Sequence, residues 1–352
     1  MYGGDLLTAE NWAEGDSLYG FIRRETGDVV FPLRFDALYE AVGCSEGYVL
    51  AAYEKGLKGD GSVWGPEYHL FDLAGNEITF ANGITPDSCV FNGILRIAHE
   101  SGEEERAAHP SGWGTVYGLA KPDGTVIVEP QYDYLEFAGD GMVSVYLDGC
   151  FGVIDLSGNV IVPPRYHMNW GGPLPSVIYR NGYAVIDEEK EDRCLIIDKT
   201  GCEIVSIPNH QPSINREDFR FYSITSPAEN GCFWVHSWMV NRESSYPRKE
   251  NDAYELMRIT DGQAVKLTET AFESIADGIA DAACEQIDES FAEGMQAVCL
   301  NGLWGYIDEN GQTVIPFQWE GACNFYHGLA LVEKNGKLSY IDHDGVIVWQ
   351  EK

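Results

Sequence analysis

The stretch Leu303–Trp319 reads LWGYIDENGQTVIPFQW, and it decides our prediction of the fold. An aromatic-glycine pair lies near its start, Asp308 precedes Gly311 by three residues, and a β-branched run ends at Pro316. Strand-like runs on both sides of a turn signal are typical of two antiparallel strands. The stretch therefore predicts a β-hairpin, followed by an aromatic residue, Trp319, that anchors the connecting segment.

Three further stretches repeat this pattern in the same frame. They are Leu18–Phe35 (LYGFIRRETGDVVFPLRF), Val116–Tyr132 (VYGLAKPDGTVIVEPQY) and Cys150–Tyr166 (CFGVIDLSGNVIVPPRY). In every copy an aromatic residue follows the turn glycine by eight residues, with a proline between them. The turn glycines Gly124 and Gly158 are 34 residues apart, so a repeat of about that length organises the chain.

Two sets of glycines and one set of aspartates define the structural positions of the repeat. A glycine inside a strand weakens it unless something packs on the bare backbone, and we expect a large ring to lie over each strand glycine. An Asp that starts a turn bonds the backbone two residues on, and a Gly then takes the left-handed position. The strand glycines are Gly20, Gly118, Gly152 and Gly305; the turn residues are Gly27, Gly124, Gly158, Gly311, Asp155 and Asp308.

A second signature joins the copies. Strand-like runs end at Asp148-Gly149, Asn301-Gly302 and Asn335-Gly336. Asn-Gly and Asp-Gly between such runs are the strongest short-range hairpin signals. We therefore predict a unit of three antiparallel strands that passes by a tight turn into the next unit.

These motifs together resemble the WG-repeat family, which is named for the pair seen here at Trp304-Gly305. The resemblance is strong over 17–56, 115–172 and 289–349, and degenerate over 57–114 and 183–288. It implies a bacterial β-repeat protein with no settled activity, so it carries architecture and almost no mechanism.

The expected fold is all-β, with tandem antiparallel meanders in a single repeat domain over 1–352. The units form either a closed propeller-like ring or a curved β-solenoid, because either one protects most strand edges. Apolar residues at four-residue spacing predict one short inserted helix over about 274–289.

Composition excludes several functional classes. Lys and Arg number 23 against 56 Asp and Glu, for a net charge of −33, which disfavours binding to nucleic acid. No apolar run is long enough for a membrane-spanning helix. No motif for a metal, a cofactor or a phosphate is recognised.

The start of the sequence and the cysteines bear on the cellular location of the protein. The start of the sequence lacks the pattern of a signal peptide, and the nine cysteines are odd in number, with no C-x-x-C pair. We expect reduced thiols and favour a cytoplasmic location, with export left open.

The candidate binding residues are aromatic residues in or near the insertions. In Phe233–Trp238 the residues alternate, so a strand there would place Trp234, His236 and Trp238 on one face. Exposed aromatic rings stack on sugars or anchor protein interfaces. The candidates are Trp64, Trp113, Trp170, Trp234, His236 and Trp238.

We expect a non-catalytic scaffold that acts as a protein-interaction module. Its acidic surface favours a basic partner through electrostatic steering. The alternatives are a glycan-binding surface protein that uses the insert tryptophans, and a hydrolase with two carboxylates.

Overall fold

The structure is a computed structural model, and it describes residues 6–11, 18–35, 43–53, 67–81, 83–102, 114–167, 177–212, 219–241, 248–275 and 291–352. All the regular secondary structure within these residues is β-strand, so the predicted all-β class is confirmed. The chain divides into two compact units, Met1–Arg165 and Tyr166–Lys352. The single repeat domain and its closure into a ring stay predictions.

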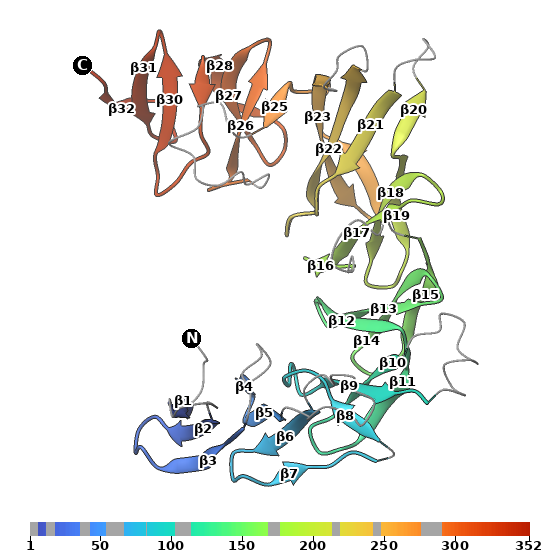
Figure 1. Cartoon of the computed structure of the whole chain (residues 1–352). Helices are drawn as coiled ribbons and strands as arrows, with labels where there is room; N and C mark the ends of the chain where they lie inside the picture. The colour runs from blue at the N-terminus through green and yellow to red at the C-terminus, as the bar shows by residue number, and fades with distance from the viewer. Residues whose placement is uncertain are drawn as a thin grey trace. The chain divides into compact units, whose positions relative to one another are not determined.

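Consecutive strands pair antiparallel, in chain order, in each sheet of the first unit (Figure 1). The sheets are β1 (Leu6–Asn11), β2 (Leu18–Arg23), β3 (Val29–Phe35); β4 (Gly43–Ser45), β5 (Tyr48–Tyr53), β6 (Glu67–Asp72), β7 (Glu77–Ile78); β8 (Ile84–Pro86), β9 (Leu95–Glu100), β10 (Thr115–Ala120), β11 (Val126–Tyr132); and β12 (Tyr134–Gly139), β13 (Met142–Leu147), β14 (Cys150–Asp155), β15 (Val160–Tyr166).

The second unit repeats this plan, with one sheet of five strands. The sheets are β16 (Tyr179–Arg180), β17 (Tyr183–Glu188), β18 (Arg193–Asp198), β19 (Glu203–Pro208); β20 (His210–Pro212), β21 (Phe219–Ile224), β22 (Cys232–Asn241), β23 (Arg248–Thr260), β24 (Gln263–Lys266); β25 (Ser274–Ile275), β26 (Met295–Leu300), β27 (Leu303–Asp308), β28 (Thr313–Trp319); and β29 (Gly321–Ala322), β30 (Ala330–Lys334), β31 (Lys337–Ile341), β32 (Ile347–Gln350).

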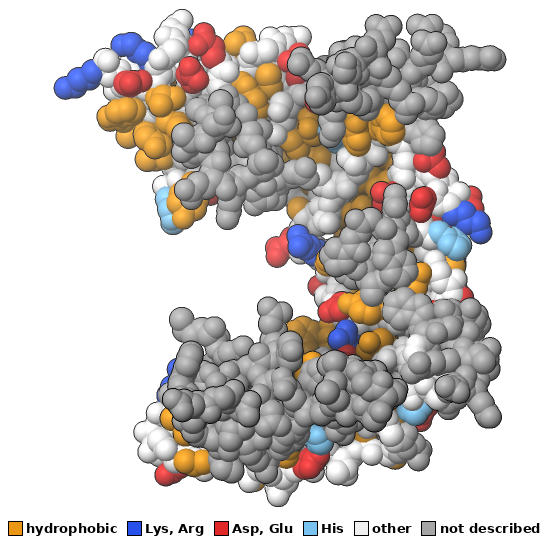
Figure 2. Space-filling view, viewed as in Figure 1, with side chains coloured by type: hydrophobic (Ala, Val, Ile, Leu, Met, Phe, Trp, Pro, Cys, Tyr) orange, Lys and Arg blue, Asp and Glu red, His pale blue; other side chains and the backbone are white. Residues whose placement is uncertain are grey.

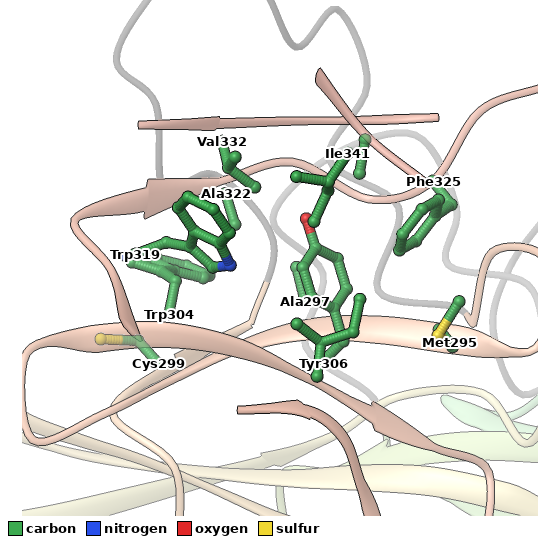
Figure 3. Close-up of a cluster of buried hydrophobic side chains, with 12 residues drawn as sticks. Met295, Ala297, Cys299, Trp304, Tyr306, Trp319, Ala322, Phe325, Val332 and Ile341 are labelled. Atoms are coloured by element: carbon green, nitrogen blue, oxygen red, sulfur yellow. The ribbon is translucent and has the colours of Figure 1, made fainter. Parts of the chain in front are cut away.

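Within each unit the cores lie between consecutive sheets, which pack face to face. Figure 3 shows the core between the sheets β25–β28 and β29–β32, where Tyr306 points toward Ile341. The Tyr306 hydroxyl donates to the Cys323 carbonyl oxygen at 2.8 Å, so the ring is buried without an unpaired polar atom. A single sheet cannot bury its apolar face alone, which is why the repeats stabilise one another.

The predicted three-stranded unit is corrected by the structure to a four-stranded sheet. The predicted unit ran across two sheets, because the tight Asn301-Gly302 turn joins β26 to β27 within one sheet. The missed strands are the first of each sheet, such as β25 and β29, which have two residues each. Strands this short carry no alternating pattern in the sequence.

The turns are built by the aspartate and glycine of each copy. The Asp155 Oδ1 atom accepts hydrogen bonds from the Ser157 and Asn159 backbone N–H groups, both at 2.8 Å. Gly158 has φ +83°, in the left-handed region that glycine adopts without strain. The same bonds recur at Asp308 and Gly311, where φ is +76°. These aspartates form turns.

The strand glycines have a different role from the one predicted. A Cβ atom on Gly152 would lie 2.7 Å from the Val162 oxygen and 2.7 Å from the Pro164 nitrogen. Gly118 and Gly305 meet the same backbone segment of their neighbouring strands, at 2.2 to 2.9 Å for the two nearest atoms. Backbone, and not a large ring, therefore occupies the space beside these three glycines. The outer strand bulges across the glycine at its proline, and only glycine leaves room for it.

The sheet β29–β32 has neither the strand glycine nor the outer-strand proline that make this close approach. Ser339 stands at the position of Gly305, and Gln350 at that of Pro316. Ser339 pairs directly with Gln350, whereas the register shifts between Trp304 and Tyr306 on β27. A side chain at this position is therefore compatible with the fold where the outer strand carries no proline bulge.

Two predictions concern residues around the sheet β25–β28. The inserted helix is not shown, since Ser274 and Ile275 form β25 and residues 276–289 lie outside the described part of the chain. The expectation of reduced thiols is wrong for Cys323, which forms a disulfide bond. A disulfide is typical of an oxidising compartment, so the cysteines no longer favour the cytoplasm. The cysteines that form no disulfide among the described residues are Cys89, Cys150, Cys194, Cys202, Cys232 and Cys299.

We predict that Gly152→Ala destabilises the protein by about 3 kcal/mol, because the new methyl group meets backbone that no rotamer change can move. Ser339→Ala is the comparison at the position without a proline bulge: Ser339 is 1% exposed and its hydroxyl has no hydrogen-bond partner in the described residues, so we expect no destabilisation there. Urea unfolding of both variants measures the difference. Equal losses of unfolding free energy in the two variants would contradict the view that Gly152 is needed because the outer strand lies against it.

We predict that Asp155→Ala lowers the free energy of unfolding by about 1 kcal/mol at pH 7, since the turn is solvent-exposed. Burial alone would raise the pKa of Asp155, but hydrogen bonds from Asn159 and Ser157 hold it below its ordinary value. The stabilisation is therefore present above the unfolded pKa of about 3.9 and lost as the pH falls through the lower folded pKa.

Urea unfolding at pH 7 and pH 3 tests the effect of Asp155→Ala. The difference from the wild type shrinks at the lower pH. Asp344→Ala is the control, since the Asp344 carboxylate has no partner in the described residues and only its backbone N–H is bonded, to Asp342. A loss from Asp155→Ala that stays constant with pH would contradict this account.

Candidate binding surfaces

The predicted tryptophans have different environments. Trp234 is 2% exposed and belongs to the core between the sheets β20–β24 and β25–β28. Its ring stacks on Phe291 at 6.4 Å between centroids and meets Phe272 edge-on at 6.1 Å. Trp234 is therefore a packing residue. Trp64, Trp113 and Trp170 lie outside the described residues.

His236 and Trp238 belong to an aromatic stack across β21, β22 and β23. The His236 ring lies 4.2 Å from Tyr254 with the two planes 2° apart, and 4.7 Å from Trp238. Trp238 also stacks on Phe221 at 5.8 Å. The His236 Nε2 atom lies 3.0 Å from Asp252 Oδ1, which orients the imidazole.

This stack limits what the two predicted residues can bind. A sugar stacks on an open ring face. The His236 ring has a ring on each side, and so has Trp238, so both present edges rather than faces. The geometry gives no support to sugar stacking on these two rings.

An ionic network around Arg96 is a feature that the sequence did not reveal. The Arg96 Nε atom donates to Asp87 at 2.5 Å, and Nη1 donates to the Leu135 carbonyl oxygen at 2.8 Å. The guanidinium also lies 5.3 Å and 5.8 Å from the Tyr117 and Tyr134 ring centres. Arg96 on β9 thereby links its sheet to β12 in the next one.

The electrostatics of the network fit a structural link. Burial raises the pKa of Asp87, and the Arg96 charge opposes that effect. Burial and a hydrogen bond to Glu136 raise the pKa of Tyr134 to about 12. The partners of Arg96 in β12 are 39 and 40 residues away, and such contacts have no signature in the local sequence.

Some of the acidic residues that the sequence assigned to the solvated surface also link sheets. The Glu46 carboxylate accepts from the Asn92 and Gly93 N–H groups at 2.7 Å each. Glu293 accepts from the Gly328 N–H at 3.0 Å and contacts His343 Nε2 at 2.8 Å. Tight turns with left-handed residues point their N–H groups at such anions.

The sheet β29–β32 exposes an apolar face that its counterpart in β25–β28 buries. We call it the outer face, defined by Leu329, Leu331, Leu338, Tyr340 and Trp349. Tyr340 and Trp349 are 42% and 51% exposed, and their rings lie 5.9 Å apart. Figure 2 shows hydrophobic side chains gathered over this sheet.

The corresponding residues of the sheet β25–β28 are buried against the next sheet. Counted from the turn glycines, Tyr306 corresponds to Tyr340 and Ile315 to Trp349. Tyr306 and Ile315 are 0% and 2% exposed, because the sheet β29–β32 covers them. The outer face thus has the composition of a buried interface between repeats and lies open to solvent in the described structure.

The described residues show neither a metal-binding cluster nor a membrane-spanning helix. They contain no group of three or more His, Cys, Asp or Glu side chains placed to hold a metal ion. Among the same residues, no helix is long and apolar enough to cross a lipid bilayer.

Comparison with solved structures gives distant likenesses. Hsv2 from Kluyveromyces lactis is 12% identical, with 62% of this chain and 62% of that chain covered and a TM-score of 0.29. A eukaryotic initiation factor is 10% identical over 98% of this chain and 94% of its own, with a TM-score of 0.30. A Lactobacillus plantarum protein is 10% identical over 91% and 96%, with a TM-score of 0.28. The matched part spans less than two thirds of Hsv2, and likenesses this weak carry no argument.

A family model gives the informative match. No curated protein matches the sequence. The model described as "WG containing repeat" matches residues 117–149, 151–168 and 304–337. These segments contain the strand glycines Gly118, Gly152 and Gly305, and the tight turns Asp148-Gly149 and Asn335-Gly336. The resemblance inferred from the sequence is therefore confirmed for these three segments, each of which matches the WG-containing repeat.

Proposed function

We propose that the chain is a non-catalytic scaffold that binds a partner protein through the outer face. The observation that carries the proposal is the exposure of Tyr340 and Trp349, at 42% and 51%, on a sheet face that the preceding repeat buries. Trp and Tyr are enriched among the residues that dominate binding energy at protein interfaces.

The charge of the chain suits a basic partner. With a net charge of −33, the protein attracts a basic protein over long range. Charge of this kind raises the association rate, while the buried aromatic residues hold the complex together. The complex should therefore form more slowly at high salt without losing its apolar contact.

The other two functions receive less support from the described residues. A glycan-binding surface would depend on Trp64, Trp113 and Trp170, which lie outside these residues. A hydrolase needs two carboxylates that converge on a substrate, whereas Asp155 and Asp308 are engaged in turns. Both stay predictions.

The ring and the solenoid differ in what they imply for the outer face. A closed ring would cover it with another sheet of the same chain, as the next sheet covers Tyr306. An open solenoid leaves it available to a partner. Both forms stay predictions.

We predict that Trp349→Ala weakens partner binding at least tenfold, about 1.4 kcal/mol, because truncation of a central tryptophan removes most of its contact. The immobilised protein first captures partners from native lysate, and titration calorimetry then measures the affinity of each identified partner. Val160→Ala, which alters another exposed apolar residue, is the matched control and should leave the affinity unchanged.

Two results would contradict this proposal. One is a Trp349→Ala variant that binds the partner as tightly as the wild type. The other is a loss of more than about 1.5 kcal/mol in the unfolding free energy of the isolated variant, since truncating an exposed side chain costs about 0.5 kcal/mol or less. The second result would mean that the chain covers its own outer face.

A further inference from the structure

A groove of about 540 Å³ lies beside β32, on the side of the sheet that faces β28. We call it the β32 groove. Among its lining residues are Trp319 at the end of β28, Lys334 and Lys337 beside the β30–β31 turn, and Val346, Ile347 and Gln350 along the outer strand. It is separate from the outer face, because Ile347 and Gln350 line it whereas Tyr340 and Trp349 do not.

The groove is locally cationic in a strongly acidic chain. Two lysines line it, and no Asp or Glu does. The Lys334 ammonium lies 5.4 Å from the Trp319 ring centre and donates to Gln318 Oε1 at 3.4 Å, which holds it over the groove wall. The Lys337 ammonium is exposed and has no hydrogen-bond or ion-pair partner among the described residues.

The lysines depart from the repeat at two positions around one tight turn. Counted from the turn glycine, Lys334 and Lys337 correspond to Leu300 and Leu303 in the sheet β25–β28. The same positions in the sheet β12–β15 are Leu147 and Cys150. Apolar residues occupy these positions in two other sheets, so the fold does not require the two positive charges.

The outer strand departs from the repeat as well. Within the described residues, β32 pairs with β31 alone, so one row of its backbone N–H and C=O groups faces away from the sheet. A proline and a bulge protect such edges in β15 and β28. Neither is present at Gln350, where the strand continues in register with Ser339.

We propose that the β32 groove binds an extended, acidic peptide segment of a partner protein. The segment pairs its backbone with the open edge of β32, as in other cases of strand addition. Its carboxylates form ion pairs with the Lys334 and Lys337 ammonium groups, and its apolar side chains contact Val346 and Ile347. Three departures from the repeat, two lysines and one missing proline, thereby serve a single site.

The test uses the full chain and a fluorescein-labelled, eight-residue peptide of alternating Glu and Val. Fluorescence anisotropy at low salt should show saturable binding that weakens as salt is added. The Lys334→Glu, Lys337→Glu double variant should bind at least tenfold more weakly. Lys199→Glu, the matched control, alters an exposed lysine on a distant turn and should leave the affinity within twofold.

Two further probes separate strand pairing from simple charge attraction. A peptide of alternating Lys and Val should not bind, because both lysines of the groove repel it. A Glu-Val peptide N-methylated at every second residue keeps its charge but cannot donate along one edge, and it should bind at least tenfold more weakly.

Several results would overturn the proposal. One is equal affinity of the peptide for the wild type and the double lysine variant. Another is a loss of affinity in Lys199→Glu as large as that in the double variant. The third is an unchanged affinity for the methylated peptide. If the double variant does not fold, Lys337→Gln takes its place, since that side chain has no partner in the described residues to lose. It should bind the peptide at least twofold more weakly, and an unchanged affinity would also overturn the proposal. Failure of this test leaves the proposal for the outer face standing, because the two sites share none of their defining residues.

Discussion

The close approach of an outer strand to a glycine of its neighbour is the constraint on which each regular sheet depends. At Gly152 the Val162 oxygen and the Pro164 nitrogen take the space of a side chain, and the same contact recurs at Gly118 and Gly305. The proline interrupts the ladder there, and pairing resumes at the aromatic residue beyond it, as between Trp304 and Trp319. The aromatic residue that follows, such as Trp319, then enters the core. This close approach is therefore a shared feature of the sheets β8–β11, β12–β15 and β25–β28.

The chain contains an internal comparison for this constraint. The sheet β16–β19 carries Leu195 and Ser206 at the positions of the glycine and the proline, and the two residues pair directly. The sheet β29–β32 carries Ser339 and Gln350, which also pair directly. Glycine and proline are therefore lost together. In β29–β32 their absence coincides with an open strand edge, two lysines in place of apolar residues, and an exposed aromatic pair. The proposals for binding rest on this concentration of departures in one sheet.

How much the sequence predicts depends on how local the cause is. The Asn301-Gly302 turn and the Asp155 turn follow from residues within a few positions of one another, and both were predicted. Short first strands such as β25 and β29 were missed, because they have two residues each and no pattern of their own. The ring expected over Gly152 was wrong, since a glycine indicates that something lies close without indicating what it is.

The candidate binding residues show the same limit. Alternation correctly placed Trp234, His236 and Trp238 on one strand, but the burial of Trp234 depends on Phe272 and Phe291, which follow much later in the chain. Arg96 and its partners in β12 carry no motif at all. The sequence did not predict the outer face for a different reason. Its residues follow the pattern of the repeat, and only the absence of a covering sheet in the described structure distinguishes this face from the buried ones.

The most direct test of this account is whether the effects of a strand glycine and an outer-strand proline on the unfolding free energy depend on each other. We would measure the unfolding free energies of Ser339→Gly, Gln350→Pro and the double variant. The account predicts that Gln350→Pro alone is strongly destabilising, because the Ser339 side chain blocks the bulge, and that Ser339→Gly recovers about 1–2 kcal/mol of that loss. Additive effects of the two substitutions would contradict it.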